Sequence, residues 1–205
     1  QLAFLLYGIA ALLGIYICIE TTWLLAVVGA VAMAIGYFYT GGPYPIAYTP
    51  FGELFSGVFM GMLIVLIAFY IQTEQITLLA VLLSIPSMLL VAAIMLSNNI
   101  RDIVGDKESG RRTMAILIGR QHATTVLLLL FIISYVWIIV MVAFGMITPW
   151  SLLVLLSIKK PIHAIKTFRT YEHPLEVMPA MKDTALTNTF FGFLLGVGLL
   201  IGYLM

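Results

Sequence analysis

Long apolar stretches recur along the whole chain, and they constrain its fold more than any other feature. A transmembrane helix needs about 20 mostly apolar residues to cross a bilayer. Seven stretches reach or approach this length, the sixth being the shortest: residues 2–19, 23–39, 54–71, 76–96, 123–147, 149–158 and 190–204. We therefore predict an all-α fold, a polytopic transmembrane helical bundle, with one membrane domain over residues 1–205.

The composition agrees with a membrane protein and excludes several other classes. Only 9% of the residues are charged, whereas soluble domains carry about 25%. So few charges cannot cover a water-facing surface, and we expect membrane lipid around the bundle. The single cysteine, Cys18, excludes an internal disulfide framework and a thiolate metal site. We expect no nucleic-acid partner.

Positive charge is confined to one side of the predicted bundle. All ten Lys and Arg residues lie in two connections, residues 101–120 after the fourth stretch and residues 159–182 before the seventh. Alternate crossings place both connections on the same side as the loop at residues 40–50. Because cytoplasmic loops carry an excess of Lys and Arg, this side is predicted to be cytoplasmic.

A polar segment directly follows the uncharged fourth stretch. Asn98, Asp102 and Asp106 recur every four residues, a spacing that puts them on one helix face with a rise of about 6 Å per step. Their oxygens are ligands that suit Mg²⁺ shared with substrate phosphates. Three cations that suit the phosphate charge follow them: Lys107, Arg111 and Arg112. The plainer alternative is a solvated helix end with mixed charges.

The position of this segment indicates the shape of its ligand. A site where a helix leaves the membrane can hold a charged head in the polar layer while an apolar tail lies among the helices. Mg²⁺ and cationic side chains around a diphosphate would stabilise it as a leaving group. We therefore expect an amphiphilic substrate with a diphosphate at one end.

The same segment carries a family resemblance. Residues 98–113, NNIRDIVGDKESGRRT, followed by Leu-Ile-Gly at 117–119, resemble the second aspartate-rich motif of the UbiA-type membrane prenyltransferases. Two further stretches resemble the branch that prenylates 1,4-dihydroxy-2-naphthoate in menaquinone synthesis. They are YTGGPYPIAY at 39–48 running into FGEL at 51–54, and MPAMK at 178–182 with TNTFFG at 187–192.

The resemblance also implies features that this sequence does not contain. The family has nine helices and a first motif of the form NxxxDxxxxxxD after the second helix. Neither that motif nor two further helices occurs here, so we expect an N-terminal portion before Gln1 to supply them. Without it, half of the metal-diphosphate site would be missing.

By resemblance, the reaction is a Mg²⁺-dependent transfer of a polyprenyl group from polyprenyl diphosphate to 1,4-dihydroxy-2-naphthoate. Loss of the ring carboxylate as CO₂ then gives demethylmenaquinone. Asp102 and Asp106 would be catalytic metal ligands, supported by Asn98. Candidates for diphosphate contact are Arg101, Lys107, Arg111 and Arg112. The resemblance also implies a multi-pass protein of the bacterial plasma membrane, with its active-site loops on the cytoplasmic side.

The loop after the second stretch is the candidate acceptor site. Tyr39, Tyr44 and Tyr48 could stack on an aromatic acceptor or face a cation with their rings. An interfacial tyrosine belt is an equally good interpretation. Glu53 could orient the acceptor, although a carboxylate at the start of a helix also suits the helix dipole.

Several alternatives remain open from the sequence. The acceptor could be 4-hydroxybenzoate or menadiol, and a less favoured hypothesis is a small transporter with Asp102 and Asp106 as an ion site. In the connection at 159–183 we expect an interfacial amphipathic helix and then an irregular lid broken by Pro174 and Pro179. Glycines at 57, 61, 192, 196 and 198 could serve close helix packing or widen a tail tunnel.

Overall fold

The computed structural model describes residues 2–205, and every regular element in that range is helical. The elements with α-helical geometry are α1 (Leu2–Glu20), α2 (Leu24–Thr40), α3 (Gly52–Ser56), α4 (Leu63–Thr73), α5 (Leu78–Arg101), α6 (Ile103–Glu108), α7 (Met114–Ile118), α8 (Arg120–Ala143), α9 (Lys159–Thr170) and α10 (Pro174–Leu204). Two 3₁₀ segments, η1 (Ile46–Tyr48) and η3 (Pro149–Ser157), and one π-helical segment, η2 (Gly57–Met62), complete the series. The predicted all-α fold is confirmed.

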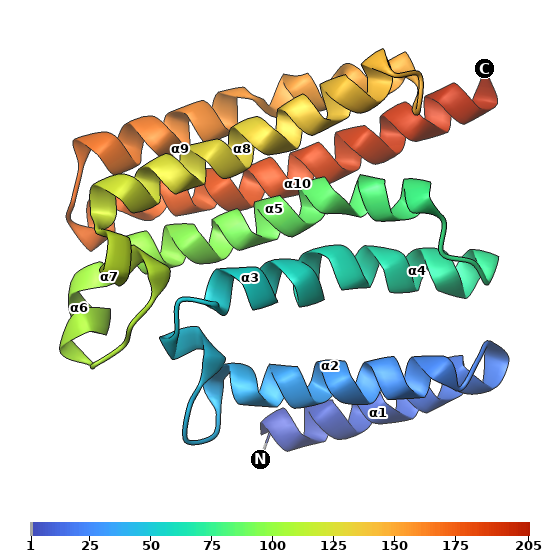
Figure 1. The fold of residues 1–205 in the computed structure, drawn as a ribbon, viewed down its shortest axis with the longest axis horizontal. Helices are drawn as coiled ribbons and strands as arrows, with labels where there is room; N and C mark the ends of the chain where they lie inside the picture. The colour runs from blue at the N-terminus through green and yellow to red at the C-terminus, as the bar shows by residue number, and fades with distance from the viewer. Residues whose placement is uncertain (1) are drawn as a thin grey trace.

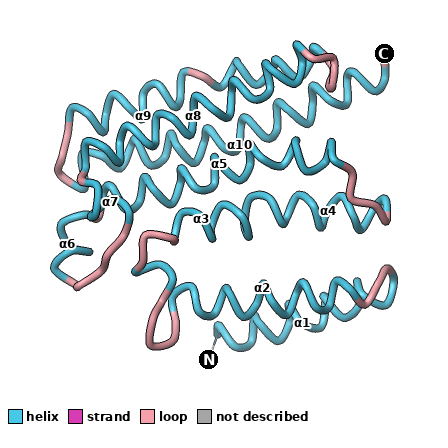
Figure 2. Tube along the Cα trace, viewed as in Figure 1, coloured by secondary structure: helices cyan, strands magenta, loops and turns pink. Residues whose placement is uncertain are grey.

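The long helices lie side by side and alternate in direction (Figure 1). The tube in Figure 2 shows that the loop at 41–51, the segment with α6 and α7, and the turn at 171–173 share one end of the bundle. The connections at 21–23, 74–77 and 144–148 lie at the opposite end. The predicted placement of the first basic connection and the tyrosine-rich loop at one end therefore agrees with the structure. For the second connection it holds only in part, because Lys159, Lys160 and Lys182 lie partway along the bundle, on α9 and α10.

Five helices are long and apolar enough to cross a membrane. They are α1, α5, α8, α10 and one continuous helix that comprises α3, η2 and α4. The helix α2 is apolar but shorter. The sixth predicted stretch is different, because its apolar part is the 3₁₀ segment η3 and its continuation is the polar helix α9.

The prediction for the connection at 159–183 was wrong in two respects. The amphipathic helix α9 does not stand apart from the bundle but packs on α8 and α10. No irregular lid follows it, because α10 begins at Pro174 and continues through Pro179 to Leu204. Pro174 occupies the first turn, where no backbone donor is needed, and Pro179 removes only a hydrogen bond close to the helix start.

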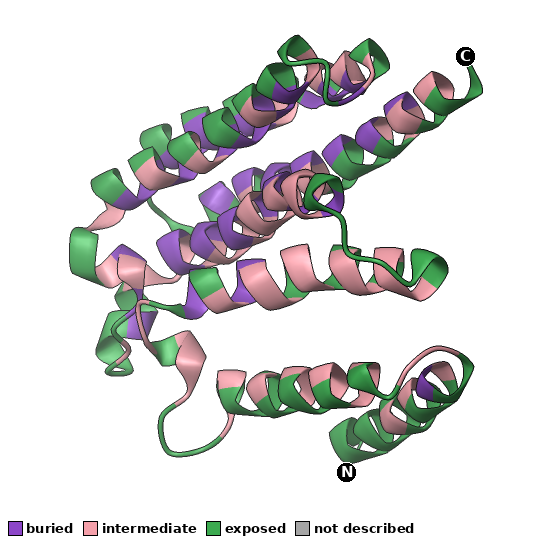
Figure 3. Ribbon diagram, turned by 45° about the vertical axis from the view of Figure 1, so that its right-hand side comes forward, coloured by how far each residue is buried: buried purple, intermediate pink, exposed green. Residues whose placement is uncertain are grey.

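The buried core lies among α5, α8, α9, α10 and η3, where large side chains such as Leu96, Ile138 and Phe191 are almost fully enclosed. In contrast, α1 has one buried residue, Cys18, and α2 has none (Figure 3). Their apolar side chains form a surface that suits contact with lipid.

The glycines fall into two groups, and close helix packing is confirmed for one of them. A Cβ added at Gly61 would lie 2.6 Å from the Met88 Cα, and one at Gly57 would lie 2.6 Å from the Met88 carbonyl oxygen. These two glycines therefore let η2 approach the α5 backbone closely, and Gly198 likewise lies against η3. An added Cβ at Gly192 or Gly196 would meet nothing within 4 Å.

Candidate functional site

The polar segment at the end of α5 keeps its helical spacing through a bend. The helix α5 ends at Arg101, and Asp102 takes φ −93° and ψ 7° before α6 begins. The Asp102 amide still donates to the Asn98 carbonyl at 3.0 Å, and the Asp106 amide to the Asp102 carbonyl at 2.9 Å. Two backbone hydrogen bonds with the helical four-residue spacing thus link Asn98 to Asp102 and Asp102 to Asp106, although α5 and α6 are separate helices.

Asp102 is paired with the residue next to it in the chain. Arg101 donates from Nε to Asp102 Oδ1 at 2.6 Å and from Nη2 to Oδ2 at 2.5 Å. The third guanidinium nitrogen, Nη1, points to Met178 Sδ of α10 at 3.5 Å. A bidentate guanidinium therefore neutralises this carboxylate and presents it between α5 and the start of α10.

Asp106 is the more enclosed carboxylate, with 8% of the residue exposed. Arg111 Nη1 lies 3.0 Å from Asp106 Oδ1. Burial raises the pKa of the Asp106 carboxyl above its ordinary value, although the Arg111 guanidinium opposes this shift. The Arg111 Nε is also buried without a hydrogen-bond partner, so this guanidinium is held in place with one donor unsatisfied.

Tyr48 joins the tyrosine-rich loop to this cluster. The Arg111 guanidinium carbon lies 4.4 Å from the centre of the Tyr48 ring, a cation–π contact. The Arg112 amide also donates to the Tyr48 carbonyl at 2.8 Å. The tyrosine-rich loop and the polar segment after α5 were predicted to lie on the same side of the bundle, and in the structure they are in direct contact.

The other predicted residues are less closely involved. Lys107 and Arg112 have exposed side chains, and Asn98 is half-buried. Tyr44 is 87% exposed and takes part in no side-chain hydrogen bond or ring contact within the described range. Tyr39 turns toward α3, where its hydroxyl donates to the Gly52 carbonyl at 3.3 Å.

Glu53 has a partner that the sequence analysis missed. Asn99 Nδ2 of α5 donates to Glu53 Oε1 at 2.8 Å, and the two residues are 8% and 3% exposed. The second carboxylate oxygen, Oε2, is buried without a partner. The sequence signal was the Asn98–Asn99 pair, whose second member lies off the face counted for metal ligands.

The side chains of Asn98, Asp102 and Asp106 carry oxygen donors of the kind that Mg²⁺ prefers, and both carboxylates are paired with arginines. Mg²⁺ is commonly held by one or two carboxylates together with substrate phosphates and water, so a complete protein cage is not required. Within residues 2–205 no three His, Cys, Asp or Glu side chains gather closely enough to hold a metal by themselves. A metal at this end of α5 would therefore need further ligands, such as phosphate oxygens.

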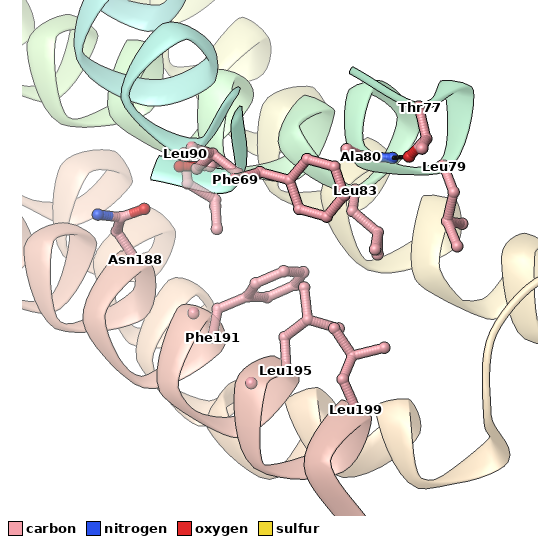
Figure 4. Close-up of a pocket in the computed structure, with 14 residues that line it drawn as sticks. Phe69, Thr77, Leu79, Ala80, Leu83, Leu90, Asn188, Phe191, Leu195 and Leu199 are labelled. Carbon is pink, nitrogen blue, oxygen red and sulfur yellow. Dashed lines mark hydrogen bonds between the residues drawn. The ribbon is translucent and has the colours of Figure 1, made fainter. Parts of the chain in front are cut away.

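An apolar cavity of about 360 Å³ lies farther along α5, between α4, α5 and α10. Figure 4 shows its lining, with Leu83 and Leu90 of α5 opposite Phe191 and Leu195 of α10, and Asn188 at one edge. Its volume is within the range of small-molecule sites. Gly192 and Gly196 also line it, so their missing side chains leave this space open.

Comparison with known proteins gives related matches over nearly the whole chain. The model of the UbiA prenyltransferase family matches residues 1–176. The 1,4-dihydroxy-2-naphthoate octaprenyltransferase of Bacillus subtilis (strain 168) is 57% identical over 203 residues, covering 99% of this chain and 65% of the relative. The protein of the same name from Mycobacterium tuberculosis (strain ATCC 25618 / H37Rv) is 29% identical, covering 96% of this chain and 66% of its own length.

A further relative, the UbiA prenyltransferase domain-containing protein 1 homolog of Drosophila melanogaster, is 32% identical over 79% of this chain and 44% of its own length. No solved structure matches. The chain spans just under two thirds of the length of the two bacterial relatives described above. The family model and the B. subtilis relative agree with the resemblance seen in the motifs, and the chain belongs to the UbiA prenyltransferase family.

Proposed function

We propose that this chain forms part of a Mg²⁺-dependent prenyltransferase that transfers a polyprenyl group from polyprenyl diphosphate to 1,4-dihydroxy-2-naphthoate. The observation that carries the proposal is the pairing of Asp102 with Arg101 and of Asp106 with Arg111 at the end of α5. The naphthoate-specific names of its bacterial relatives support the choice of acceptor.

The arginines and carboxylates suit an exchange of partners when the donor binds. A diphosphate offers guanidinium groups the same paired oxygens as a carboxylate does. Arg101 and Arg111 would turn to the diphosphate, joined by the exposed Lys107 and Arg112. Asn98, Asp102 and Asp106 would then hold Mg²⁺, which supplies charge neutralisation to the departing diphosphate when bound.

The donor's apolar chain would lie in the cavity between α4, α5 and α10. At a rise of 1.5 Å per residue, Leu90 lies about 18 Å along α5 from Asp102. A linear amphiphile with its diphosphate at Asp102 would therefore place its tail at the level of this cavity. The mostly apolar lining of the cavity suits an isoprenoid chain better than a polar ligand.

The acceptor would bind beside Tyr48, whose ring already faces the cation of Arg111. Tyr39 and Tyr44 remain candidates for the same role. Glu53 would help to orient the acceptor site without contacting solvent, because its carboxylate is buried and accepts a hydrogen bond from Asn99. The chain would lie in the plasma membrane, with this end of the bundle on the cytoplasmic side and lipid around the helices.

The proposed bond changes balance without an added oxidant. The C–O bond between the prenyl group and the diphosphate breaks, and its electrons leave with the diphosphate. The ring carbon that carries the carboxylate forms the new C–C bond. Loss of that carboxylate as CO₂ returns its electron pair to the ring and gives demethylmenaquinol, the hydroquinone. Its conversion to demethylmenaquinone is a separate two-electron oxidation outside this reaction.

The test uses membranes that contain the full-length protein, labelled polyprenyl diphosphate, Mg²⁺ and one acceptor at a time. We expect a labelled prenyl naphthohydroquinone, or the quinone that air forms from it, with dihydroxynaphthoate, and one CO₂ released for each prenyl group transferred. A product formed only with 4-hydroxybenzoate or menadiol would replace the proposed acceptor. No prenylated product with any of the three would overturn the enzyme proposal and favour the transporter hypothesis.

A further inference from the structure

A second candidate binding site lies between α8 and α9, which contact each other along the bundle (Figure 1). At the basic end of the bundle the two helices border a cavity of about 410 Å³. Two arginines and a glutamate contribute to its lining, Arg120, Arg169 and Glu172, together with the polar residues Thr124 and Thr125. We call the surface that begins here the α8–α9 groove.

The same groove becomes apolar farther from the basic end. A cavity of about 270 Å³ is lined there by residues such as Leu128, Ile132 and Ile139 of α8 and Ile162 of α9. On α8 the lining positions of both cavities recur every three or four residues, at 121, 125, 128, 132, 136 and 139. That spacing places them on one helix face, so the polar and apolar cavities lie in line.

The charges at the polar end can serve a ligand. Arg120 donates from Nη1 to the Ile100 carbonyl at 3.0 Å and from Nη2 to the Tyr171 carbonyl at 2.7 Å, while its Nε is buried without a partner. Arg169 and Glu172 are exposed, and neither belongs to an ion pair among residues 2–205. The fixed positive charge of Arg120, the guanidinium of Arg169, unpaired within residues 2–205, and the carboxylate of Glu172 together complement a phosphate that carries an amine.

We propose that the α8–α9 groove binds a membrane phospholipid with a phosphoethanolamine head. Arg120 and Arg169 would face the phosphate, Glu172 would face the ammonium group, and an acyl chain would lie along the apolar part of the groove. The depth is suitable, because α8 begins at Arg120 and its apolar sequence starts a turn later. Basic pockets between helices on the cytoplasmic side are typical sites for lipid head groups.

This site is separate from the proposed catalytic site. The carboxylates Asp102 and Asp106 lie on the α5–α6 segment, and the cavity proposed for the donor tail lies between α4, α5 and α10. The inference therefore does not depend on the proposed prenyl transfer. It predicts a bound lipid whether or not the enzyme turns over.

The test measures lipids retained by the purified full-length protein, by native mass spectrometry in detergent with added phosphatidylethanolamine, phosphatidylglycerol or inorganic phosphate. Arg169→Glu removes a phosphate contact and Ile132→Trp fills the apolar part of the groove. Lys182→Ala, which changes an exposed lysine of α10, is the charge control. Ile133→Trp is the matched steric control, because Ile132 and Ile133 are both 46% exposed and only Ile132 lines the groove.

We expect both groove variants to bind phosphatidylethanolamine at least about tenfold more weakly than the wild type. Arg169→Glu loses hydrogen bonds to a charged group, which contribute free energies of that size, and the indole of Ile132→Trp occupies the space of the acyl chain. Both controls should bind as the wild type does. Glu172→Gln should weaken phosphatidylethanolamine binding and leave phosphatidylglycerol binding unchanged.

Equal lipid binding by groove and control variants would overturn the proposal. Binding of inorganic phosphate without any retained lipid would also overturn it, because that result would indicate a site for a free anion. A second protein chain retained at the groove in place of lipid would also overturn it. An unchanged circular dichroism spectrum for each variant ensures that lost binding is not lost folding.

Discussion

The buried pair of Glu53 and Asn99 makes the stability of the bundle sensitive to one hydrogen bond. Asn99→Leu keeps much of the side-chain volume but removes the donor that lies 2.8 Å from Glu53 Oε1. The other carboxylate oxygen is already without a partner. The variant would thus leave the whole carboxyl group of a 3% exposed residue unpaired.

The expected loss in the free energy of unfolding is about 1–3 kcal/mol, the usual cost of a buried polar group without a partner. This corresponds to a decrease of roughly five- to 150-fold in the folding equilibrium constant. The double variant Asn99→Leu/Glu53→Leu should recover part of the loss, because it removes both polar groups. Equilibrium unfolding in mixed detergent micelles gives the free energy of unfolding of the wild type, Asn99→Leu and the double variant.

Gln72→Leu is the control, because Gln72 is an exposed amide that donates to the Ala68 carbonyl at 2.9 Å. We expect its free energy of unfolding to stay within about 0.5 kcal/mol of the wild type. Equal values for Asn99→Leu and Gln72→Leu would refute the reasoning. A double variant less stable than Asn99→Leu would refute it as well.

Two further predictions concern glycines. Gly61→Ala should lower the free energy of unfolding by about 1–3 kcal/mol, because its Cβ would press on the α5 backbone. Gly192→Ala should leave the free energy of unfolding unchanged or raise it by up to about 1 kcal/mol. Thermal unfolding compares the two variants, and equal midpoints would contradict the packing argument. Gly196→Phe should fill part of the apolar cavity and shift turnover toward prenyl diphosphates with shorter chains, whereas the control Gly14→Phe on α1 should not. Turnover measured with a series of donor chain lengths tests this. The same preference in Gly196→Phe as in the wild type would show that the tail binds elsewhere.

The fold was predictable to the extent that it follows from hydropathy and charge. Uninterrupted apolar stretches indicated the long helices, and the one-sided placement of Lys and Arg indicated which loops share an end. The interpretation failed at α10, because prolines were read as breaks without regard to their positions in the first turns of a helix. It also failed at α9, whose polar sequence suggested an interfacial helix although one face packs in the bundle.

The candidate site was predictable where its residues are close in the sequence. The four-residue spacing of Asn98, Asp102 and Asp106 follows from helix geometry alone. The contact of Glu53 with Asn99 joins residues 46 positions apart and depends on how closely η2 approaches α5. The stacking of Arg111 on Tyr48 likewise depends on the path of two loops, which no local pattern specifies.

The central claim is that Asp102 and Asp106 hold Mg²⁺ against a prenyl diphosphate, and the most direct test is the turnover of Asp102→Asn in the full-length protein. This change keeps the side-chain size and removes the charge, so the helices should stay folded. At saturating Mg²⁺ we predict a loss of at least about 100-fold in prenyl transfer to dihydroxynaphthoate. Turnover within twofold of the wild type would contradict the claim.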